Sequence, residues 1–482
     1  MRILFVSAEV APYAKVGGLA DVAGSLPKAL QDLGHDVRVV MPAYGLVTEN
    51  PEFGVKPIER EFFVRVNDSR FERATIQETS ATGFPIWLLD TEGIFHRAKS
   101  SEEVYTFQRN DYLFFAQAAL EVCQDMNWMP DVVHCHDWHT GFIPVVMRES
   151  RGEMWDEVAS VFTIHNLAYQ GEFGFDTLDA IGVRHDLYHP DYTEAYGSVN
   201  FLKSGMAFAD QVNTVSPNYV KEIQTPQFGC RLEGLMIHLA ENDRLSGILN
   251  GIDMEVFNPA TDPHLVAPYS ADDLSGKAKC RAALIEEAGL NIPAEDPIFA
   301  MVTRLSNQKG FDLVLHAADQ MISAGAALVV QGLGDPWAAD QLRQLEQKHP
   351  GRVKFFQVFD ADLAQRVYSG ADAFLMPSAF EPCGLGQMFA MRYGTVPVVK
   401  KTGGLADTVF DGKNGFVFDK HTAEALASTV LQAISAFRTP EAWAKIQQAG
   451  MTGDYSWAKS AKAYSELYAK ASAMRKQPAR SR

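Results

Sequence analysis

Short apolar runs alternate with glycine-containing turns and helical segments along most of this chain, in two separate stretches. Residues 2–6 form an apolar run typical of parallel strands that are buried on both faces, and a helical pattern follows at 19–33. The same rhythm restarts at residue 298. Strands that alternate with helices form parallel sheets with right-handed crossovers. The sequence therefore predicts an α/β fold with two doubly wound domains.

A turn signal places the boundary between these domains. Asn250 and Gly251 form a turn dipeptide, and the polar, proline-containing segment 258–275 follows. We therefore expect an N-terminal domain at 1–248 and a C-terminal domain at 249–455, each of a size that one domain can fill.

The last part of the chain, 456–482, is expected to begin with a helix. Its apolar residues fall on one face, which we expect to cross back to the N-terminal domain before a frayed basic tail. The residues on that face are Trp457, Ala461, Tyr464 and Tyr468.

Charge and cysteine content exclude several classes of protein. The net charge of −17 argues against nucleic acid and against an anionic membrane surface as the main partner. The five cysteines are scattered and form no CxxC pair, which favours reduced thiols in a cytoplasmic protein. No apolar run approaches the roughly 18 residues of a membrane span. The apolar start of the chain meets Glu9 at once, so it is interpreted as a buried strand rather than a signal peptide.

One eight-residue motif occurs twice. K-V-G-G-L-A-D-V at 15–22 recurs as K-T-G-G-L-A-D-T at 401–408, with six of eight positions identical. The copies lie in opposite halves, each where a loop is expected to enter a helix. Two related sheet domains would explain the repeat.

Two loops carry cations beside a predicted strand. Gly17 and Gly18 allow a ligand to approach the backbone, N–H groups at a helix start attract anions, and Lys15 adds a positive charge. The spacing fits neither a dinucleotide fingerprint nor a Walker loop. Arg304 and Lys309 follow a strand five residues apart and can converge on one diphosphate. A glycine turn with a solvated lysine, and two ordinary surface charges, are the alternatives.

The segment 381–387, E-P-C-G-L-G-Q, is expected to turn tightly into a helix whose first N–H groups can meet an anion. Glu381 at this edge could accept hydrogen bonds from sugar hydroxyls, or it could cap the helix. Cys383 has no recognisable base beside it and is not expected to act as a nucleophile.

Histidines follow two further strands. His134 and His136 point to one side of an extended strand, as in HxH metal pairs, but the run H-C-H-D-W-H at 134–139 matches no known zinc signature. The alternative is a polar edge at which Asp137 meets sugar hydroxyls. His165 lies at the carboxyl end of another strand, where open α/β sheets bind ligands, although a purely structural histidine is equally compatible.

Taken together and in this order, these motifs resemble those of bacterial glycogen synthases and plant starch synthases. The resemblance extends to about residue 470 and includes T-I-H-N-L-A-Y-Q-G at 163–171, N-G-I-D at 250–253 and R-L-S-N-Q-K-G at 304–310. It implies a GT-B fold, with two Rossmann-like doubly wound parallel-sheet domains facing across a cleft. It also implies retaining transfer of glucose from ADP-glucose to the nonreducing end of an α-1,4-glucan such as glycogen, without a metal or other cofactor.

The resemblance also assigns roles to residues. Arg304 and Lys309 would bind the donor diphosphate and stabilise the departing ADP, and Glu381 would orient the donor glucose. Asp137 and His165 would line the sugar and acceptor site. The remaining donor contacts would come from Lys15, Gly17, Gly18, Gly384 and Leu385, with Phe359 stacking on the adenine.

Two positions depart from the family pattern. Gly386 stands where Thr or Ser is common, so a side-chain hydrogen bond near the donor is expected to be absent. Phe95 is aligned with a tyrosine of an enterobacterial relative, which puts a hydroxyl contact to the acceptor in doubt.

Three other functions remain open at this point. The first is a transferase of the same fold that uses another donor, such as UDP-glucose. The second is a metal-dependent hydrolase built on His134, His136 and His139. The third is a catalytically silent glucan-binding protein, which would have no need for cations that grip a diphosphate.

Overall fold

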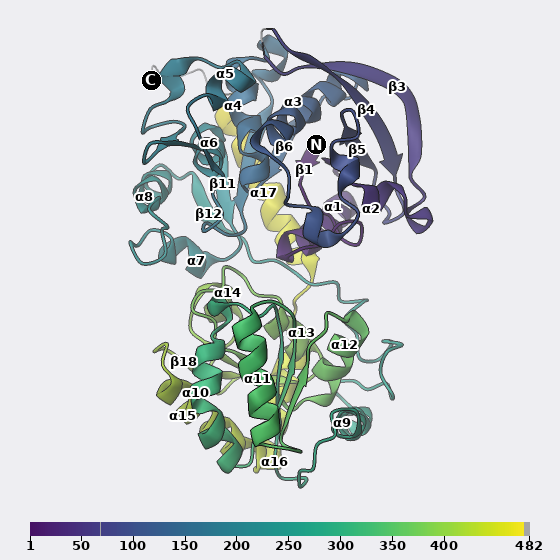
Figure 1. Cartoon of the computed structure of the whole chain (residues 1–482), viewed down its shortest axis with the longest axis vertical. Helices are drawn as coiled ribbons and strands as arrows, with labels where there is room; N and C mark the ends of the chain where they lie inside the picture. The colour runs from purple at the N-terminus through teal and green to yellow at the C-terminus, as the bar shows by residue number, and fades with distance from the viewer. Residues whose placement is uncertain (68, 477–482) are drawn as a thin grey trace. The chain divides into compact units, whose positions relative to one another are not determined.

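The computed structural model describes residues 1–67 and 69–476, and the chain divides into two compact units (Figure 1). The first comprises Met1–Gly251 with the stretch that begins at Trp457, and the second comprises Ile252–Ser456. This division falls three residues after the boundary expected at 248. The expected tail lies partly outside the described residues, at 477–482.

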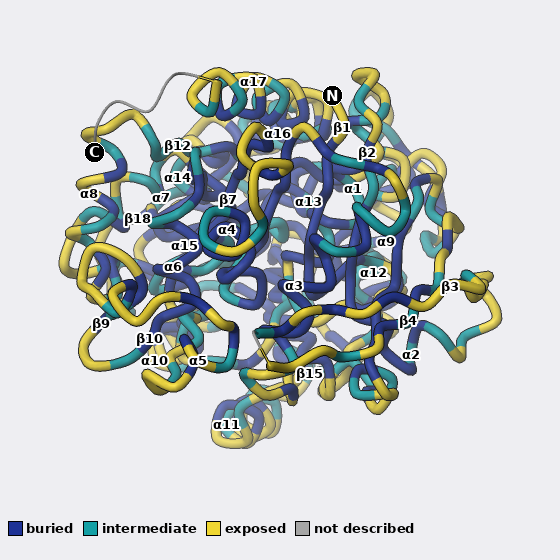
Figure 2. The backbone as a smooth tube through the Cα atoms, turned by 90° about the horizontal axis from the view of Figure 1, so that it is seen from above, coloured by how far each residue is buried: buried dark blue, intermediate teal, exposed yellow. Residues whose placement is uncertain are grey.

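The first unit is built on a mostly parallel sheet. Its strand order in the described residues is β12-β11-β7-β6-β1-β2-β5-β4-β3, with β4 antiparallel to both β5 and β3. The hairpin of β3 and β4, which the sequence did not predict, leaves many side chains exposed (Figure 2). The strands are β1 (Arg2–Val6), β2 (Asp36–Pro42), β3 (Lys56–Arg65), β4 (Phe71–Thr79), β5 (Ile86–Asp90), β6 (Val132–His136), β7 (Ala159–Ile164), β11 (Gln211–Thr214) and β12 (Leu245–Gly247).

Helices and a small antiparallel sheet complete this unit. The small sheet has the order β8-β10-β9, formed by β8 (Glu172–Phe173), β9 (Glu194–Ala195) and β10 (Ser198–Asn200). The helices are α1 (Gly18–Asp32), α2 (Gly45–Thr48), α3 (Arg109–Asp125), α4 (Phe142–Glu149), α5 (Thr177–Ile181), α6 (Phe201–Phe208), α7 (Pro217–Glu222), α8 (Glu233–Glu241) and α17 (Trp457–Arg475).

The second unit has a fully parallel sheet of order β15-β14-β13-β16-β17-β18. Its strands are β13 (Ile298–Val302), β14 (Ala327–Gln331), β15 (Val353–Phe356), β16 (Ala373–Met376), β17 (Val396–Lys400) and β18 (Phe416–Phe418). Its helices are α9 (Ser275–Glu287), α10 (Phe311–Ser323), α11 (Pro336–Lys348), α12 (Ala361–Gly370), α13 (Gly386–Arg392), α14 (Gly403–Thr408), α15 (Ala423–Phe437) and α16 (Pro440–Met451). Two doubly wound α/β units are thus confirmed.

Each sheet has a point at which its strand order reverses. In the first unit this point lies between β1 and β6, and in the second it lies between β13 and β16. Crossovers leave on opposite faces there, so the loops at the carboxyl ends of the two strands diverge and open a crevice. The loops after β1, β6, β13 and β16 are therefore the places where ligands are expected.

The repeated motif does not mark equivalent positions in the two units. Residues 15–22 follow β1, the first strand of its sheet, whereas 401–408 follow β17, two strands away from β13. Each copy does enter a helix, α1 or α14. The explanation by two related domains is therefore wrong for this repeat.

Helix α17 packs against the first unit. It contacts α1, β7 and β11, and Figure 1 shows it in yellow beside the teal strand β11. Tyr464 and Tyr468 on its inner face are fully buried. The Tyr464 hydroxyl accepts a hydrogen bond from Asn213 Nδ2 (3.1 Å), and that of Tyr468 lies 2.8 Å from His134 Nδ1. The helix is therefore part of the core of this unit.

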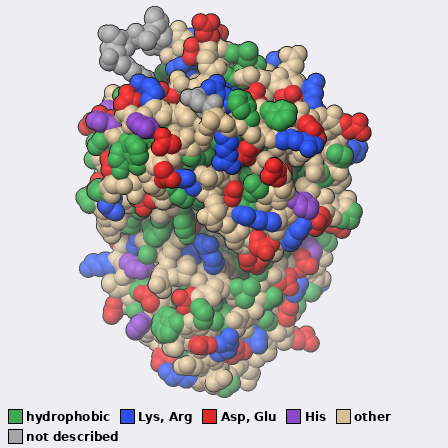
Figure 3. Space-filling view, turned by 45° about the horizontal axis from the view of Figure 1, so that its top comes forward, with side chains coloured by type: hydrophobic (Ala, Val, Ile, Leu, Met, Phe, Trp, Pro, Cys, Tyr) green, Lys and Arg blue, Asp and Glu red, His purple; other side chains and the backbone are tan. Residues whose placement is uncertain are grey.

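The cysteines, the helices and the surface charges bear on the expectations drawn from composition. None of the five cysteines forms a disulfide bond. Within residues 1–67 and 69–476, no helix combines the length and the apolar character that a membrane span requires. On the face shown in Figure 3, acidic and basic side chains are interspersed.

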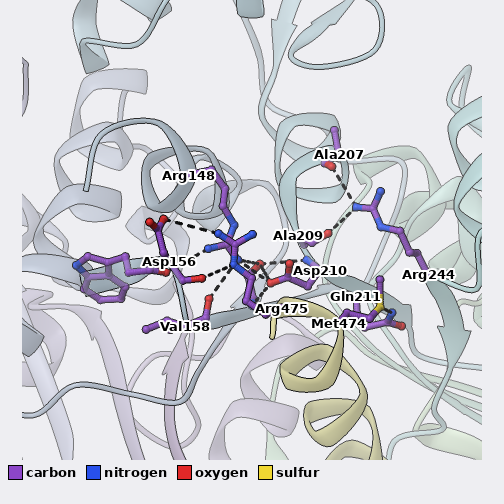
Figure 4. Close-up of polar contacts among 12 residues, drawn as sticks. Arg148, Asp156, Val158, Ala207, Ala209, Asp210, Gln211, Arg244, Met474 and Arg475 are labelled. Atoms are coloured by element: carbon purple, nitrogen blue, oxygen red, sulfur yellow. Dashed lines mark hydrogen bonds and ion pairs between the residues drawn. The ribbon is translucent and has the colours of Figure 1, made fainter. Parts of the chain in front are cut away.

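A buried ion pair joins α4 to the residue before β11, and Ser160 connects β7 to the same carboxylate (Figure 4). Arg148 lies 2.6 Å from Asp210, and the side chain of each is only 11% exposed. The N–H and the hydroxyl of Ser160 donate to the same carboxylate oxygen at 2.8 and 2.9 Å. At the end of α17, Arg475 donates to the Asp156 carbonyl and Gln211 donates to the Met474 sulfur.

Substitution Asp210→Ala should destabilise the first unit strongly, because it leaves the Arg148 guanidinium buried without its carboxylate. A loss of about 3–5 kcal/mol is expected. The matched control Asp156→Ala removes an exposed partner of Arg475 and should cost less than about 1 kcal/mol. Denaturant unfolding followed by tryptophan fluorescence measures both, since five of the seven tryptophans lie in this unit. An equal loss of unfolding free energy in the two variants would contradict a stabilising role of the buried Arg148–Asp210 pair.

Candidate active site

In the second unit, the loops after β13 and β16 are joined by hydrogen bonds. The N–H of Ala379 donates to the Gln308 carbonyl (2.8 Å), and Gln308 Nε2 donates to the Phe380 carbonyl (3.1 Å). Gly310 makes this approach possible, because it has φ of +71° and an added Cβ would lie 2.2 Å from the Pro377 oxygen. One backbone hydrogen bond and one side-chain hydrogen bond therefore join the two loops at the reversal point of this sheet.

An ion pair crosses the same point. Lys309 Nζ lies 2.6 Å from Glu381 Oε2, and the Ser378 hydroxyl donates to that oxygen at 3.0 Å. Glu381 is 7% exposed. Arg304 is exposed and forms no ion pair with any described residue. The structure thus brings Lys309 and Glu381 together and leaves Arg304 open to an anion.

The second copy of the repeated motif supports Glu381. The N–H of Gly404 donates to the Glu381 carbonyl at 3.1 Å. An added Cβ on Gly403 would lie 1.8 Å from the same oxygen, and its φ of +42° also favours glycine. The backbone of residues 401–408 therefore packs closely against the loop that carries Glu381 and donates a hydrogen bond to it.

The other donor residues predicted in this unit are more dispersed. Gly384 and Leu385 directly precede α13. Phe359, on the loop after β15, is 79% exposed, and β15 lies two strands from β13. An added Cβ on Gly386 would lie 3.1 Å from the Phe374 ring, so the family's Thr or Ser would have to displace this packing.

In the first unit, a buried carboxylate shapes the glycine loop after β1. Glu9 is 2% exposed, and its Oε2 accepts the N–H groups of Val16 (2.6 Å) and Gly17 (2.8 Å). The Tyr105 hydroxyl donates to its other oxygen. Burial raises the pKa of Glu9 to about 7, against the opposing effect of the Gly17 and Val16 N–H groups. The Gly17 N–H is thus already occupied, whereas Gly18 begins α1.

Lys15 also has a carboxylate partner. Its Nζ lies 2.6 Å from Asp21 Oδ1, and its side chain is 45% exposed. Burial raises the pKa of Asp21, and the Lys15 charge lowers it. Lys15 and Lys309 are therefore both held by carboxylates of their own unit.

Asp137 and His165 lie side by side at the carboxyl ends of β6 and β7. Asp137 Oδ1 accepts the His165 N–H at 2.8 Å. Asp137 has φ of +55°, a strained conformation for a residue with a side chain. Burial raises the pKa of Asp137 to about 7 and lowers that of His165 to about 3. His165 is therefore neutral near neutral pH.

The three-histidine metal site is not formed. His134 lies between the Thr163 and Tyr468 hydroxyls (2.6 and 2.8 Å), and His139 stacks on Tyr105. Among the described residues, no group of three or more His, Cys, Asp or Glu side chains could hold a metal ion. These rings instead fill the interior behind the sheet edge.

Phe95 packs inside the first unit. It is fully buried, with its ring centroid 4.9 Å from that of Phe107 and 6.2 Å from that of Tyr44. The hydroxyl at this edge comes from Tyr105 instead, on Glu9. The loss of an acceptor contact at position 95 stays a prediction.

Sequence reasoning missed Glu9, Tyr105 and Ser378. A charged residue three positions after a buried strand was a usable signal for Glu9, because the loop that follows has N–H groups to satisfy. The contact between Tyr105 and Glu9 spans 96 residues, and no local pattern indicates it.

Comparison with known proteins shows the family to which this chain belongs. Residues 2–238 match the family described as starch synthase catalytic domain, and 285–449 match glycosyl transferases group 1. A glycogen synthase of Syntrophotalea carbinolica is 42% identical over 98% of this chain and 99% of that relative. The chain belongs to the glycogen synthase family. Another member, from Thioalkalivibrio sulfidiphilus, is 44% identical over 97% of this chain and 99% of its own length.

Solved structures place the family in the GT-B fold. The catalytic domain of starch synthase IV from Arabidopsis thaliana, bound to ADP and acarbose, superposes with a TM-score of 0.90 at 32% identity, covering 98% of this chain and 99% of that one. Sucrose-phosphate synthase from Thermosynechococcus elongatus shares the fold at 18% identity, with a TM-score of 0.60, over 97% of this chain and 98% of its own. The chain is accordingly a glycosyltransferase with two Rossmann-like domains.

Transfer activity should depend on the ionised forms of Glu9 and Asp137, since each accepts backbone N–H groups as a carboxylate. Both pKa values are raised to about 7, and the charge of Glu9 contributes to the shift of Asp137. The value of kcat/KM should therefore fall as pH drops through about 7. Because the two carboxylates interact, the apparent pKa values of this profile describe Glu9 and Asp137 together. A pH–rate profile at constant ionic strength measures it.

The variant Glu9→Gln tests the coupling. It removes one negative charge, which lowers the pKa of Asp137, so the remaining acid limb should move to lower pH. An acid limb that moves to higher pH, or a parent profile that is flat down to about pH 5, would contradict this account.

Proposed function

We propose that this chain elongates glycogen by transferring glucose from ADP-glucose to the nonreducing end of an α-1,4-glucan, with retention of the anomeric configuration. The observation that carries the proposal is the Lys309–Glu381 pair beside the exposed Arg304 at the reversal point of the second sheet. Family membership supports it, as does the likeness to a starch synthase solved with ADP and acarbose.

The chemistry follows from charge development. Cleavage of the bond between glucose and phosphate builds negative charge on the departing ADP. Arg304 supplies a planar fork of donors and Lys309 a compact positive charge, and preorganised cations of this kind stabilise such a transition state most. In the first unit, Lys15 and Gly18 are proposed to contact donor phosphates as well.

The sugar is proposed to be held by the carboxylates and the histidine. Glu381 orients the donor glucose, while Asp137 and the neutral His165 contact sugar and acceptor hydroxyls. With no assigned nucleophile, retention is explained by substitution on one face, in which the leaving phosphate takes the acceptor's proton. A glucosyl adduct trapped on Glu381 or Asp137 would overturn this step.

Donor base, metal requirement and location belong to the same proposal. The exposed ring of Phe359 could stack on adenine, although uracil would fit it equally well, which keeps UDP-glucose as the competing donor. No metal is assigned, because the cations of the chain itself neutralise the diphosphate. The absence of disulfides among the cysteines supports a cytoplasmic enzyme.

The decisive assay follows labelled glucose into glycogen from ADP-glucose and, in parallel, from UDP-glucose, with EDTA present. Transfer that resists the chelator and strongly prefers ADP-glucose is expected. A preference for UDP-glucose would overturn the donor assignment alone. Glucan binding without transfer from either donor would support a silent binding protein.

Substitution Lys309→Met should lower kcat/KM for the donor by about 10²–10³-fold, because it removes one of the charges that stabilise the leaving diphosphate. The matched control is Lys348→Met, which breaks an exposed ion pair with Asp319 in the same unit and should change kcat/KM less than about twofold. Steady-state kinetics on both variants measure this. A Lys309 variant that performs like the Lys348 variant would contradict the role.

A further inference from the structure

His136 is a fully buried side chain to which the proposed chemistry assigns no role. It is the last residue of β6, and its ring packs against two others. The centroid of the Phe5 ring lies 4.1 Å away and that of His134 lies 4.0 Å away, and these two neighbours are 5.1 Å from each other. Among residues 1–67 and 69–476, the His136 ring makes one hydrogen bond, from its Nδ1 to Nε2 of His165 at 3.0 Å.

The neighbouring ring is fixed by hydrogen bonds at both nitrogens. The Thr163 hydroxyl donates its proton to Asn213 Oδ1 (2.7 Å), so it must accept from His134 Nε2 (2.6 Å). His134 Nδ1 is then the acceptor for the Tyr468 hydroxyl at 2.8 Å. Because Tyr468 belongs to α17, the C-terminal helix secures the ring against which His136 packs.

The unpartnered nitrogen of His136 indicates where its proton lies. Nε2 is buried and has no hydrogen-bond partner in the described part of the chain. A proton on Nε2 would be a buried N–H donor without an acceptor, which lowers the stability of the fold and is rare in proteins. The ring proton of His136 is therefore assigned to Nδ1. Nδ1–H therefore donates to His165 Nε2, which must be unprotonated.

The tautomer of His165 follows from this donation. Burial keeps His165 neutral, so its single ring proton resides on Nδ1. That nitrogen has no hydrogen-bond partner among the described residues, and His165 is only partly buried. The side chain consequently presents an N–H donor, rather than a lone pair, at the carboxyl end of β7.

We propose that His136 is a positioning residue, which fixes the tautomer and orientation of His165 so that its Nδ1–H is presented to an oxygen of the sugar substrate. The inference rests on the proposed function for the identity of that substrate. The His136–His165 hydrogen bond itself does not depend on it.

Three substitutions of His136 distinguish a role in positioning His165 from a role in filling the core. His136→Asn keeps an amide donor near the place of Nδ1, His136→Gln moves the donor toward the place of Nε2, and His136→Leu has none. We expect kcat to fall about 10- to 100-fold in the Leu and Gln variants, and KM for the donor to change less than about threefold. The Asn variant should recover to within about fivefold of the parent.

A control variant on β7 loses a buried hydrogen bond away from the histidines. Ser160→Ala removes the hydroxyl that donates to Asp210, so it should lower the thermal midpoint as the His136 variants do, yet change kcat less than about threefold. Equal loss of kcat in Ser160→Ala and His136→Leu would show that activity follows stability, and would overturn the proposal. Recovery by Gln instead of Asn would overturn it too.

The tautomer itself is read by ¹⁵N NMR of the histidine-labelled full chain, with the His165 signals assigned by their loss in His165→Asn. The expected spectrum has a protonated Nδ1 and an unprotonated Nε2 in the parent and the Asn variant, and a mixture in the Leu variant. A protonated Nε2 in the parent would overturn the inference. This readout needs no turnover, so it stands apart from any failure of the glucose-transfer assay.

Discussion

The ion pair between Lys309 and Glu381 is the contact on which the proposed chemistry depends. It joins the loops after β13 and β16, the two strands between which the sheet order of the second unit reverses. A lysine in such a loop would otherwise be mobile, and a buried carboxylate without a cation would be costly. The ion pair fixes the positions of both the Lys309 ammonium and the Glu381 carboxylate. The hydrogen bonds made by the Gln308 side chain and accepted by its carbonyl, together with the close approach of Gly403 and Gly404 to the Glu381 carbonyl, hold the same loops at that spacing.

In the first unit, the loops at the sheet edge are held by carboxylates without a paired lysine. Glu9 ties down the glycine loop after β1, and Asp137 ties down the His165 backbone after β7, so acidic groups take up N–H donors that the loops leave open. Both carboxylates are held where ionisation is unfavourable, which is a common cost of building a site at a sheet edge. Behind them, α17 fills the interior with tyrosine hydroxyls that satisfy buried polar groups on β6 and β11.

Much of this arrangement could be predicted from the sequence, because it depends on local rules. Apolar runs gave the central strands, and the polar residues that follow them gave Lys15, Asp137, His165, Arg304 and Glu381. The exposed hairpin of β3 and β4 lacks a continuous apolar run and was missed. The burial of Phe95 and the pairing of Tyr105 with Glu9 depend on contacts between distant parts of the chain. The repeat at 401–408 misled because sequence similarity does not show which strand a loop follows.

Calorimetric binding of ADP and of AMP to the full chain tests the central claim most directly. If Arg304 and Lys309 grip the diphosphate, ADP should bind at least about tenfold more tightly than AMP, since the second phosphate gains charge-assisted hydrogen bonds. Substitution Arg304→Leu should remove most of that difference while leaving AMP affinity nearly unchanged. Equal affinities of the unmodified chain for ADP and AMP would contradict a diphosphate site at this sheet edge.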